Sequence, residues 1–143
     1  MHLRASILWL AALLCAFAVA ASEPVSPRQL SQALQSQHPP LVIDVRTQAE
    51  FDAGHIPGAV LIPHDQLAQR LDEVPADREL VVYCHSGHRA TLAEHLLTDH
   101  QRTVRQLDGS WIAWREAGML VEPAEPAEPT EPTEPAEPTK QMP

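Results

Sequence analysis

The sequence predicts an α/β domain in which helices cover both faces of a parallel sheet. Three short apolar runs that contain β-branched residues, a composition typical of buried strands, lie at 41–45, 59–62 and 80–83. Segments with apolar residues at helical spacing separate these runs and follow the last one. Strands that alternate with helices build parallel sheets, so this order of elements favours the doubly covered α/β class.

Two capping boxes mark the first helices of the domain. Ser26-Pro27-Arg28-Gln29 offers a capping serine, a proline at the first helical position and a glutamine that can reach back. After the strand predicted at 41–45, Thr47 and Glu50 form the second box, which opens a short helix that Gly54 ends.

The remaining elements continue the alternation. The strand at 59–62 leads to a helix whose apolar face is Leu67, Leu71 and Val74, and Pro75 ends that helix. The chain then continues with the strand at 80–83, a helix with an apolar stripe over 92–97, a more polar strand at 103–107 and a last short helix that Gly118 ends.

The first 21 residues have the features of a secretory signal peptide. Arg4 precedes an apolar run over residues 7–21, which ends in small residues with Ala18 and Ala20 in the arrangement that signal peptidase accepts. The run is shorter than the roughly 20 residues that a spanning helix needs. We therefore expect cleavage, a periplasmic or secreted protein and no stable membrane insertion afterwards. An uncleaved N-terminal anchor is the alternative.

Residues 122–143 are predicted to form a disordered tail. From Glu122 to Thr139 the triplet Glu-Pro-Ala or Glu-Pro-Thr occurs six times, and a proline in every triplet prevents helix and sheet formation. Polyproline II has three residues per turn and would line the glutamates along one edge. We interpret the tail as a solvated spacer, with a dedicated binding motif as the alternative.

The residues between these ends, 22–121, suffice for one compact domain with one core. They carry 13 acidic residues against eight arginines, with no basic stripe or aromatic platform, so nucleic-acid binding is not expected. Once the signal is removed, Cys84 is the only cysteine, and an internal disulfide is excluded. We expect a monomer whose lone thiol needs an explanation.

The loop that begins at Cys84 has the features of a nucleophile site. Cys84 directly follows the strand at 80–83, and ligands of parallel sheets bind beyond the carboxyl ends of strands. A free thiol with a pKa near 8.5 needs help to ionise, and three features offer it. These are the start of the next helix, the cation of Arg89, and Gly87, which lets successive amides point inward. Attack on a phosphate ester or on a sulfane sulfur fits such a loop.

The segment Cys84-His85-Ser86-Gly87-His88-Arg89-Ala90 resembles the active-site loop of the rhodanese family, C-x-S-G-x-R followed by a small residue. The resemblance covers about residues 26–121. Further stretches that match in order are Leu41 to Arg46 with Glu50-Phe51, Gly54 to Ala59, and Leu107 to Trp111 with Trp114 and Gly118.

The resemblance implies a five-stranded parallel sheet and a sulfurtransferase that needs no cofactor. Cys84 would take sulfur from a small anionic donor such as thiosulfate and hold it as a persulfide until a thiol or cyanide removes it. The amides of His85, Ser86, Gly87, His88 and Arg89 would cradle that sulfur, and Arg89 would help to hold the anion. The related phosphatases have a longer loop, Cys-x5-Arg, whereas Ala90 stands at that arginine position here.

One position departs from the family pattern. Family members commonly have a second glycine where Ser110 stands, and we expect Ser110 to act as a helix cap instead.

The polar residues near the loop allow structural and metal-binding roles besides catalysis. Asp44 and Arg46 are candidates for a supporting role, and a structural pair is favoured over direct catalysis. His85 and His88 with Cys84 suggest a metal, but no second cysteine or carboxylate completes a ligand set, so no metal is expected.

Two other function classes compete with sulfur transfer. A non-catalytic rhodanese-like binding module typically lacks the cysteine, and a thiol–disulfide oxidoreductase needs a resolving cysteine, which the chain lacks once the predicted signal is removed.

Overall fold

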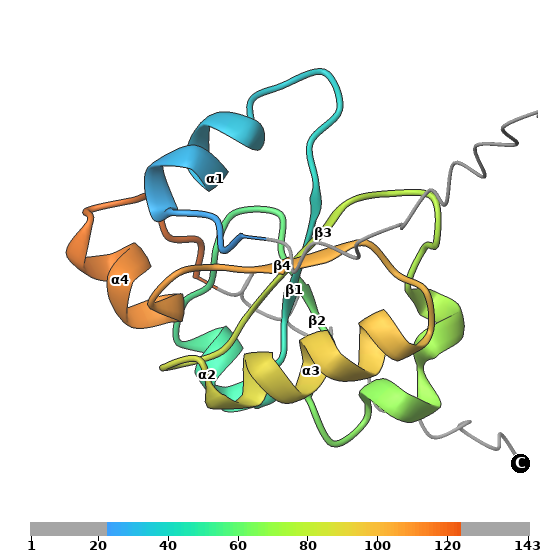
Figure 1. Ribbon diagram of the computed structural model, residues 1–143. Helices are drawn as coiled ribbons and strands as arrows, with labels where there is room; N and C mark the ends of the chain where they lie inside the picture. The colour runs from blue at the N-terminus through green and yellow to red at the C-terminus, as the bar shows by residue number, and fades with distance from the viewer. Residues whose placement is uncertain (1–22, 124–143) are drawn as a thin grey trace, which may run out of the picture.

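The computed structural model describes residues 23–123, which contain a parallel sheet in the order β2-β1-β3-β4 (Figure 1). Strands β1 and β3 occupy the centre and pair in register, with Leu41 opposite Leu80 and Asp44 opposite Tyr83. All four residues of β3 are buried, as expected of a strand covered on both faces. The strands are β1 (Leu41–Asp44), β2 (Val60–Leu61), β3 (Leu80–Tyr83) and β4 (Val104–Gln106).

Helices cover both faces of the sheet, as predicted. Figure 1 shows α1 and α4 on one side, and α3 with two short 3-10 turns on the other. Val42 and Val81 face the first layer, whereas Ile43 and Val82 face the second, because alternate strand residues point to opposite faces. The helices are α1 (Pro27–Ala33), α2 (Gln48–Asp52), α3 (His88–Asp99) and α4 (Ser110–Glu116), and the 3-10 turns are η1 (Leu67–Gln69) and η2 (Leu71–Glu73).

The prediction of five strands is wrong, since the described residues form four. A fifth position exists only as a parallel bridge between Val25 and Leu107. The Val25 N–H donates to the Gln106 carbonyl at 2.8 Å. The bridge stops there because Pro24 has no N–H to donate and Ser26 already caps α1.

The capping boxes at Ser26 and Thr47 are confirmed, with both reciprocal hydrogen bonds present in each. The helix predicted over 67–74 is wrong in type, because the segment forms η1 and η2 instead. The amides of Arg70 and Val74 donate to carbonyls three residues back, and Pro75 leaves no room for a longer helix.

The ordered contacts continue one residue past the boundary predicted at 121. Glu122 forms an antiparallel bridge with His55, whose N–H and carbonyl exchange hydrogen bonds of 2.8 and 2.9 Å with it. The predicted signal at 1–21 and the repeats from 124 onward lie outside the described residues. Across residues 23–123 no helix combines the length and apolar character needed to cross a bilayer.

Candidate active site

Cys84 lies where β3 ends, and only 1% of it is exposed. The Gly87 N–H donates to its Sγ at 3.1 Å, so the loop curls back over the sulfur. Gly87 has a φ of 113°, a backbone conformation that side-chain-bearing residues rarely adopt. No atom lies within 4 Å of where a Cβ would stand, so conformation rather than space requires glycine here.

The carbonyl groups of the loop are held by the first turn of α4. Trp111 N–H donates to the Cys84 carbonyl at 3.0 Å, and Ile112 N–H donates to the His85 carbonyl at 3.2 Å. These amides are among the donors that a helix start leaves unpaired. Because C=O and N–H of a trans peptide point in opposite directions, the amides of His85 and Ser86 face away from α4. The carbonyls of Cys84 and His85 therefore accept hydrogen bonds from α4, and the amides of His85 and Ser86 point the other way, where they can donate to an anion.

Ser110 does not act as the predicted helix cap. Gly109 occupies the cap position, and the buried Ser110 hydroxyl accepts from the Cys84 N–H at 3.3 Å. Ser110 has a φ of 54°, in the left-handed region that favours glycine. That φ is a physical reason for a glycine in the family pattern at this position. Here the serine hydroxyl adds a hydrogen bond to the backbone of the nucleophile candidate.

Arg89 points both of its terminal nitrogens at Glu50. Nη1 and Nη2 each donate to a different carboxylate oxygen at 2.8 Å. The hydrogen bonds from Arg89 hold the pKa of Glu50 well below its usual range, and the N–H and hydroxyl of Thr47 act in the same direction. Glu50 in turn raises the pKa of Arg89, to which the nearby Cys84 sulfur also contributes. Arg89 is thus a fixed cation beside the thiol.

Glu50 is the site residue that the sequence did not reveal. The sequence placed it in a capping box with Thr47, a role that it also fills, and in a stretch that resembles the family pattern, but assigned it no role at the site. It lies 39 residues before Arg89, and no spacing rule connects positions so far apart.

Asp44 and Arg46 form a buried ion pair that contacts α4, the helix whose first turn binds the Cys84 loop. Arg46 Nη2 lies 2.6 Å from the Asp44 carboxylate and also donates to the Gly54 carbonyl at 2.8 Å. Burial lowers the pKa of Arg46, but the hydrogen bond and charge of Asp44 outweigh it and raise the pKa. The guanidinium carbon lies 4.4 Å from the ring centre of Trp111, so the pair packs under α4. This geometry is that of a structural pair.

The other predicted loop residues surround Cys84 at the surface. His85, Ser86 and His88 are exposed and Gly87 is half-buried. His88 begins α3, a helix of 12 residues whose N-terminus carries partial positive charge next to the loop. Within residues 23–123, no three His, Cys, Asp or Glu side chains gather in a group that could hold a metal ion.

The chain has recognisable relatives. The profile of the rhodanese-like domain matches residues 26–117. A sulfurtransferase of Allochromatium vinosum is 36% identical over 96 residues, which are 66% of this chain and 90% of that protein. An HTH-type transcriptional regulator of Mycobacterium tuberculosis is 42% identical over 83 residues, which are 57% of this chain but only 37% of the regulator.

Solved structures show the same fold. A rhodanese-like domain protein from Staphylococcus aureus superposes with a TM-score of 0.66 at 25% identity, covering 73% of this chain and all of that one. A thiosulfate sulfurtransferase from Pseudomonas aeruginosa gives a TM-score of 0.62 at 27% identity, and the match covers 71% of this chain and 19% of that one.

Proposed function

The chain belongs to the rhodanese-like domain family, and we propose that it is a sulfurtransferase that carries sulfane sulfur on Cys84. One observation above all supports the proposal. The Gly87 N–H meets the Cys84 sulfur at 3.1 Å, in a loop whose carbonyls are tied to α4. Amides that are available around a sulfur stabilise negative charge on it, first on the thiolate and later on a persulfide.

The first half-reaction loads the protein. The thiol proton passes to solvent, and the thiolate of Cys84 attacks the outer sulfur of thiosulfate or a similar donor. An S–S bond forms to Cys84 while the S–S bond within thiosulfate breaks, and sulfite leaves with that electron pair. The N-terminus of α3 and the cation of Arg89 favour the approach of an anion to this point.

The second half-reaction unloads the sulfur. A thiolate acceptor attacks the outer sulfur of the persulfide, the bond to Cys84 breaks, and Cys84 regains its thiolate. The acceptor leaves as a persulfide, or as thiocyanate when cyanide is the acceptor. The same amides serve both steps, because negative charge returns to the same place.

The loop length supports sulfur rather than phosphate as the group transferred. From Cys84 to Arg89 the loop has six residues, and Ala90 stands where Cys-x5-Arg phosphatases have their arginine. The Ala90 side chain is buried at the start of α3 and offers no donor to a phosphate.

We also propose that the protein acts after export, as a monomer in the periplasm or outside the cell. The support is the pattern of residues 1–21, a basic residue before an apolar run with small residues at its end. The mass of the protein recovered from its host tests this, because cleavage would remove those residues and an anchor would retain them.

The test of sulfur transfer is the intact mass of the purified protein after incubation with thiosulfate. We expect the mass of one added sulfur atom, located on Cys84 by peptide mapping and removed by cyanide. Cys84→Ser should take up no sulfur, because the hydroxyl is far less nucleophilic and cannot form a persulfide. If Cys84 stays unmodified with thiosulfate and with other sulfane donors, the chain is a binding module and the proposal fails.

A further inference from the structure

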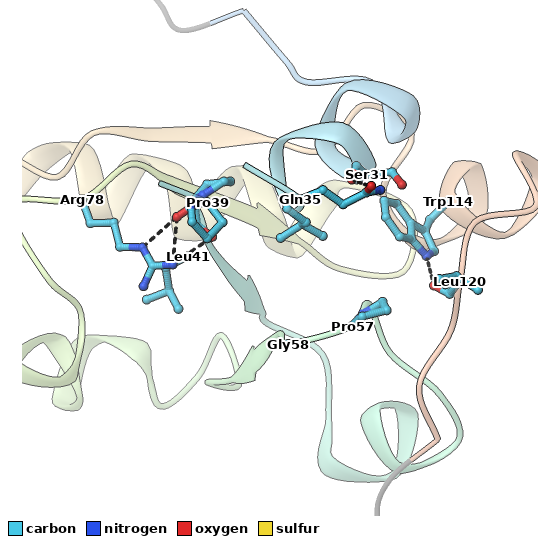
Figure 2. A pocket seen from close by; sticks show the side chains of 11 residues that line it. Ser31, Gln35, Pro39, Leu41, Pro57, Gly58, Arg78, Trp114 and Leu120 are labelled. Carbon is cyan, nitrogen blue, oxygen red and sulfur yellow. Dashed lines mark hydrogen bonds between the residues drawn. The ribbon is translucent and has the colours of Figure 1, made fainter. Parts of the chain in front are cut away.

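A groove of about 360 Å³ lies at the end of the sheet opposite Cys84 (Figure 2). Leu41, the first residue of β1, lies in its wall, whereas Cys84 follows the last residue of β3. Because the strands are parallel, these positions mark opposite ends of the domain. The groove is therefore separate from the proposed sulfur site.

The walls of the groove are mostly apolar and rich in rings. Pro39 and Leu41 line one side, and Pro57 faces them across the opening. Leu34 also lines the groove. Leu120, which is 80% exposed, also lines the groove. The indole N–H of Trp114 donates to the Leu120 carbonyl at 2.8 Å. A preformed apolar surface that stays open to solvent is the kind that proline-rich segments occupy.

One cation lies at the edge of this groove. Arg78 donates through Nε and Nη2 to the Pro39 carbonyl at 3.0 and 2.8 Å, which holds the guanidinium at the rim. Among residues 23–123, no carboxylate forms an ion pair with Arg78, and the same is true of Arg28, Arg102 and Arg115. Of these four, only Arg78 lines the groove. A negatively charged occupant would complete the site.

The acidic repeats of this chain start at the same rim. The Gly58 N–H, which lines the groove, donates to the carboxylate of Glu122 at 3.0 Å, and Glu122 is the first glutamate of the repeats. We propose that the groove binds the chain's own Glu-Pro-Ala/Thr segment, residues 124–139. Proline rings would lie against Leu34 and Leu41, with a glutamate beside Arg78.

Length and composition both suit this occupant. Sixteen residues in polyproline II reach about 50 Å, enough to turn back from the rim and cross the groove. Polyproline II is already ordered before it binds, so docking costs little chain entropy. Attachment at Pro123 keeps the effective concentration of the segment high, and the repeated triplets offer several equivalent registers. The groove thus gives the predicted spacer a binding partner within its own chain.

The test compares backbone amide spectra of the whole chain with those of a variant that ends after Pro123. Docking predicts that the amide resonances of Gln35 and Leu41 differ between the two proteins. A synthetic peptide of residues 124–143, added to the shortened variant, should move these resonances toward their positions in the whole chain. Higher salt should reduce the differences, because exposed charges are screened within about 8 Å at physiological ionic strength.

A matched pair of variants of the whole chain checks the location. Gln35→Glu adds a negative charge inside the groove and should shift the resonance of Leu41 toward its position in the shortened variant. Gln69→Glu makes the same change in η1, outside the groove, and should leave that resonance unchanged. Spectral differences confined to His55, Gly58 and the last residues would overturn the proposal. Differences that grow with protein concentration would also overturn it, because the occupant would then be the tail of a second copy.

Discussion

The guanidinium of Arg89 interacts with both Glu50 and Cys84. Both terminal nitrogens hold Glu50, yet the cation also lies close enough to Cys84 for the sulfur to affect its pKa. A bidentate pair with a carboxylate fixes the plane of the guanidinium, which a lone lysine could not provide. In the proposed reaction, an anionic sulfur donor would therefore share Arg89 with Glu50. The carboxylate fixes the position of the guanidinium and partly neutralises its charge.

Alanine should reduce mainly the activity at position 89 and mainly the stability at position 46. Arg89→Ala should lower thiosulfate use by about 10–100-fold, the equivalent of one charge-assisted contact of about 1.5–3 kcal/mol. It should cost at most about 1 kcal/mol of stability, because the ion pair that it removes is partly exposed. Arg46→Ala leaves the Asp44 carboxylate buried and unpaired, so it should cost about 3–5 kcal/mol of stability. Steady-state kinetics and thermal unfolding of both variants check the contrast. Equal losses of activity in folded proteins would place Arg46 in the anion site.

The Glu50–Arg89 pair also predicts how stability depends on pH. The folded-state pKa of Glu50 is depressed, so its contribution is present above the unfolded value, about 4.3, and is lost as pH falls through the lower folded value. Between pH 7 and pH 5 this contribution should stay constant. Glu50→Gln should therefore narrow its stability difference from the wild type only below about pH 4, as denaturant unfolding at several pH values would measure. A difference that changes between pH 7 and pH 5 would contradict the prediction.

At the scale of elements, the first turn of α4 organises the Cys84 loop. Two consecutive residues, Gly109 and Ser110, have left-handed φ values of 64° and 54°. This backbone conformation directs the Ser110 hydroxyl and the N–H groups of Trp111 and Ile112 to the loop. Replacing Gly109 should lower the stability of the fold, because a Cβ there would lie 2.5 Å from the Cβ of Ala113. Ser110 keeps its side chain in this conformation and uses it to bind the Cys84 N–H.

Alanine and glycine at position 110 separate the hydrogen bond from the backbone strain. Ser110→Ala leaves the Cys84 N–H without its acceptor and keeps the strained φ, so it should cost about 1–3 kcal/mol. Ser110→Gly loses the same acceptor but relieves a left-handed residue, worth about 1–2 kcal/mol. Urea unfolding should therefore rank glycine above alanine. Equal stabilities would show that the φ of 54° carries no strain.

At the scale of the whole molecule, the backbone contacts of the fold extend to Glu122, one residue past the boundary predicted at 121. The two backbone bonds between Glu122 and His55, and the carboxylate on Gly58, attach the last described residues to the turn after α2. His55 is itself buried and stacks on Phe51 with ring centres 3.7 Å apart. Glu122, the first residue of the repeats, is therefore fixed to the domain.

Two truncations test this boundary. A chain that ends after Val121 loses both bonds to His55, each worth about 0.5–1.5 kcal/mol, and its Tm should fall by about 4–8 °C per kcal/mol lost. A chain that ends after Pro123 keeps these bonds and should unfold within about 5 °C of the whole chain, since weak docking of the tail adds under about 1 kcal/mol. Both should keep their sulfur-transfer turnover, because neither cut removes a residue of the Cys84 loop or of α4. Identical Tm values for the two truncations would show that the bridge contributes nothing.

Features that depend on neighbouring residues were determined by the sequence alone. The capping boxes at Ser26 and Thr47 involve residues three positions apart, so their pattern is visible in the chain. The buried strand before Cys84 and the helix after it follow from apolar periodicity in the same way. The α/β class and the place of the thiol at a strand end were therefore predictable.

The contacts that shape the site and the edges of the fold were decided only by the tertiary structure. Glu50 meets Arg89 across 39 residues, Ser110 meets Cys84 across 26, and Glu122 meets Gly58 across 64. In place of the predicted fifth strand, the described residues form one bridge at Val25, because Pro24 and the α1 cap allow no further pairing. Local propensity sets which elements form, but partners far apart in the chain are chosen by how those elements pack. Packing depends on all of the elements at once, and no short pattern in the sequence encodes it.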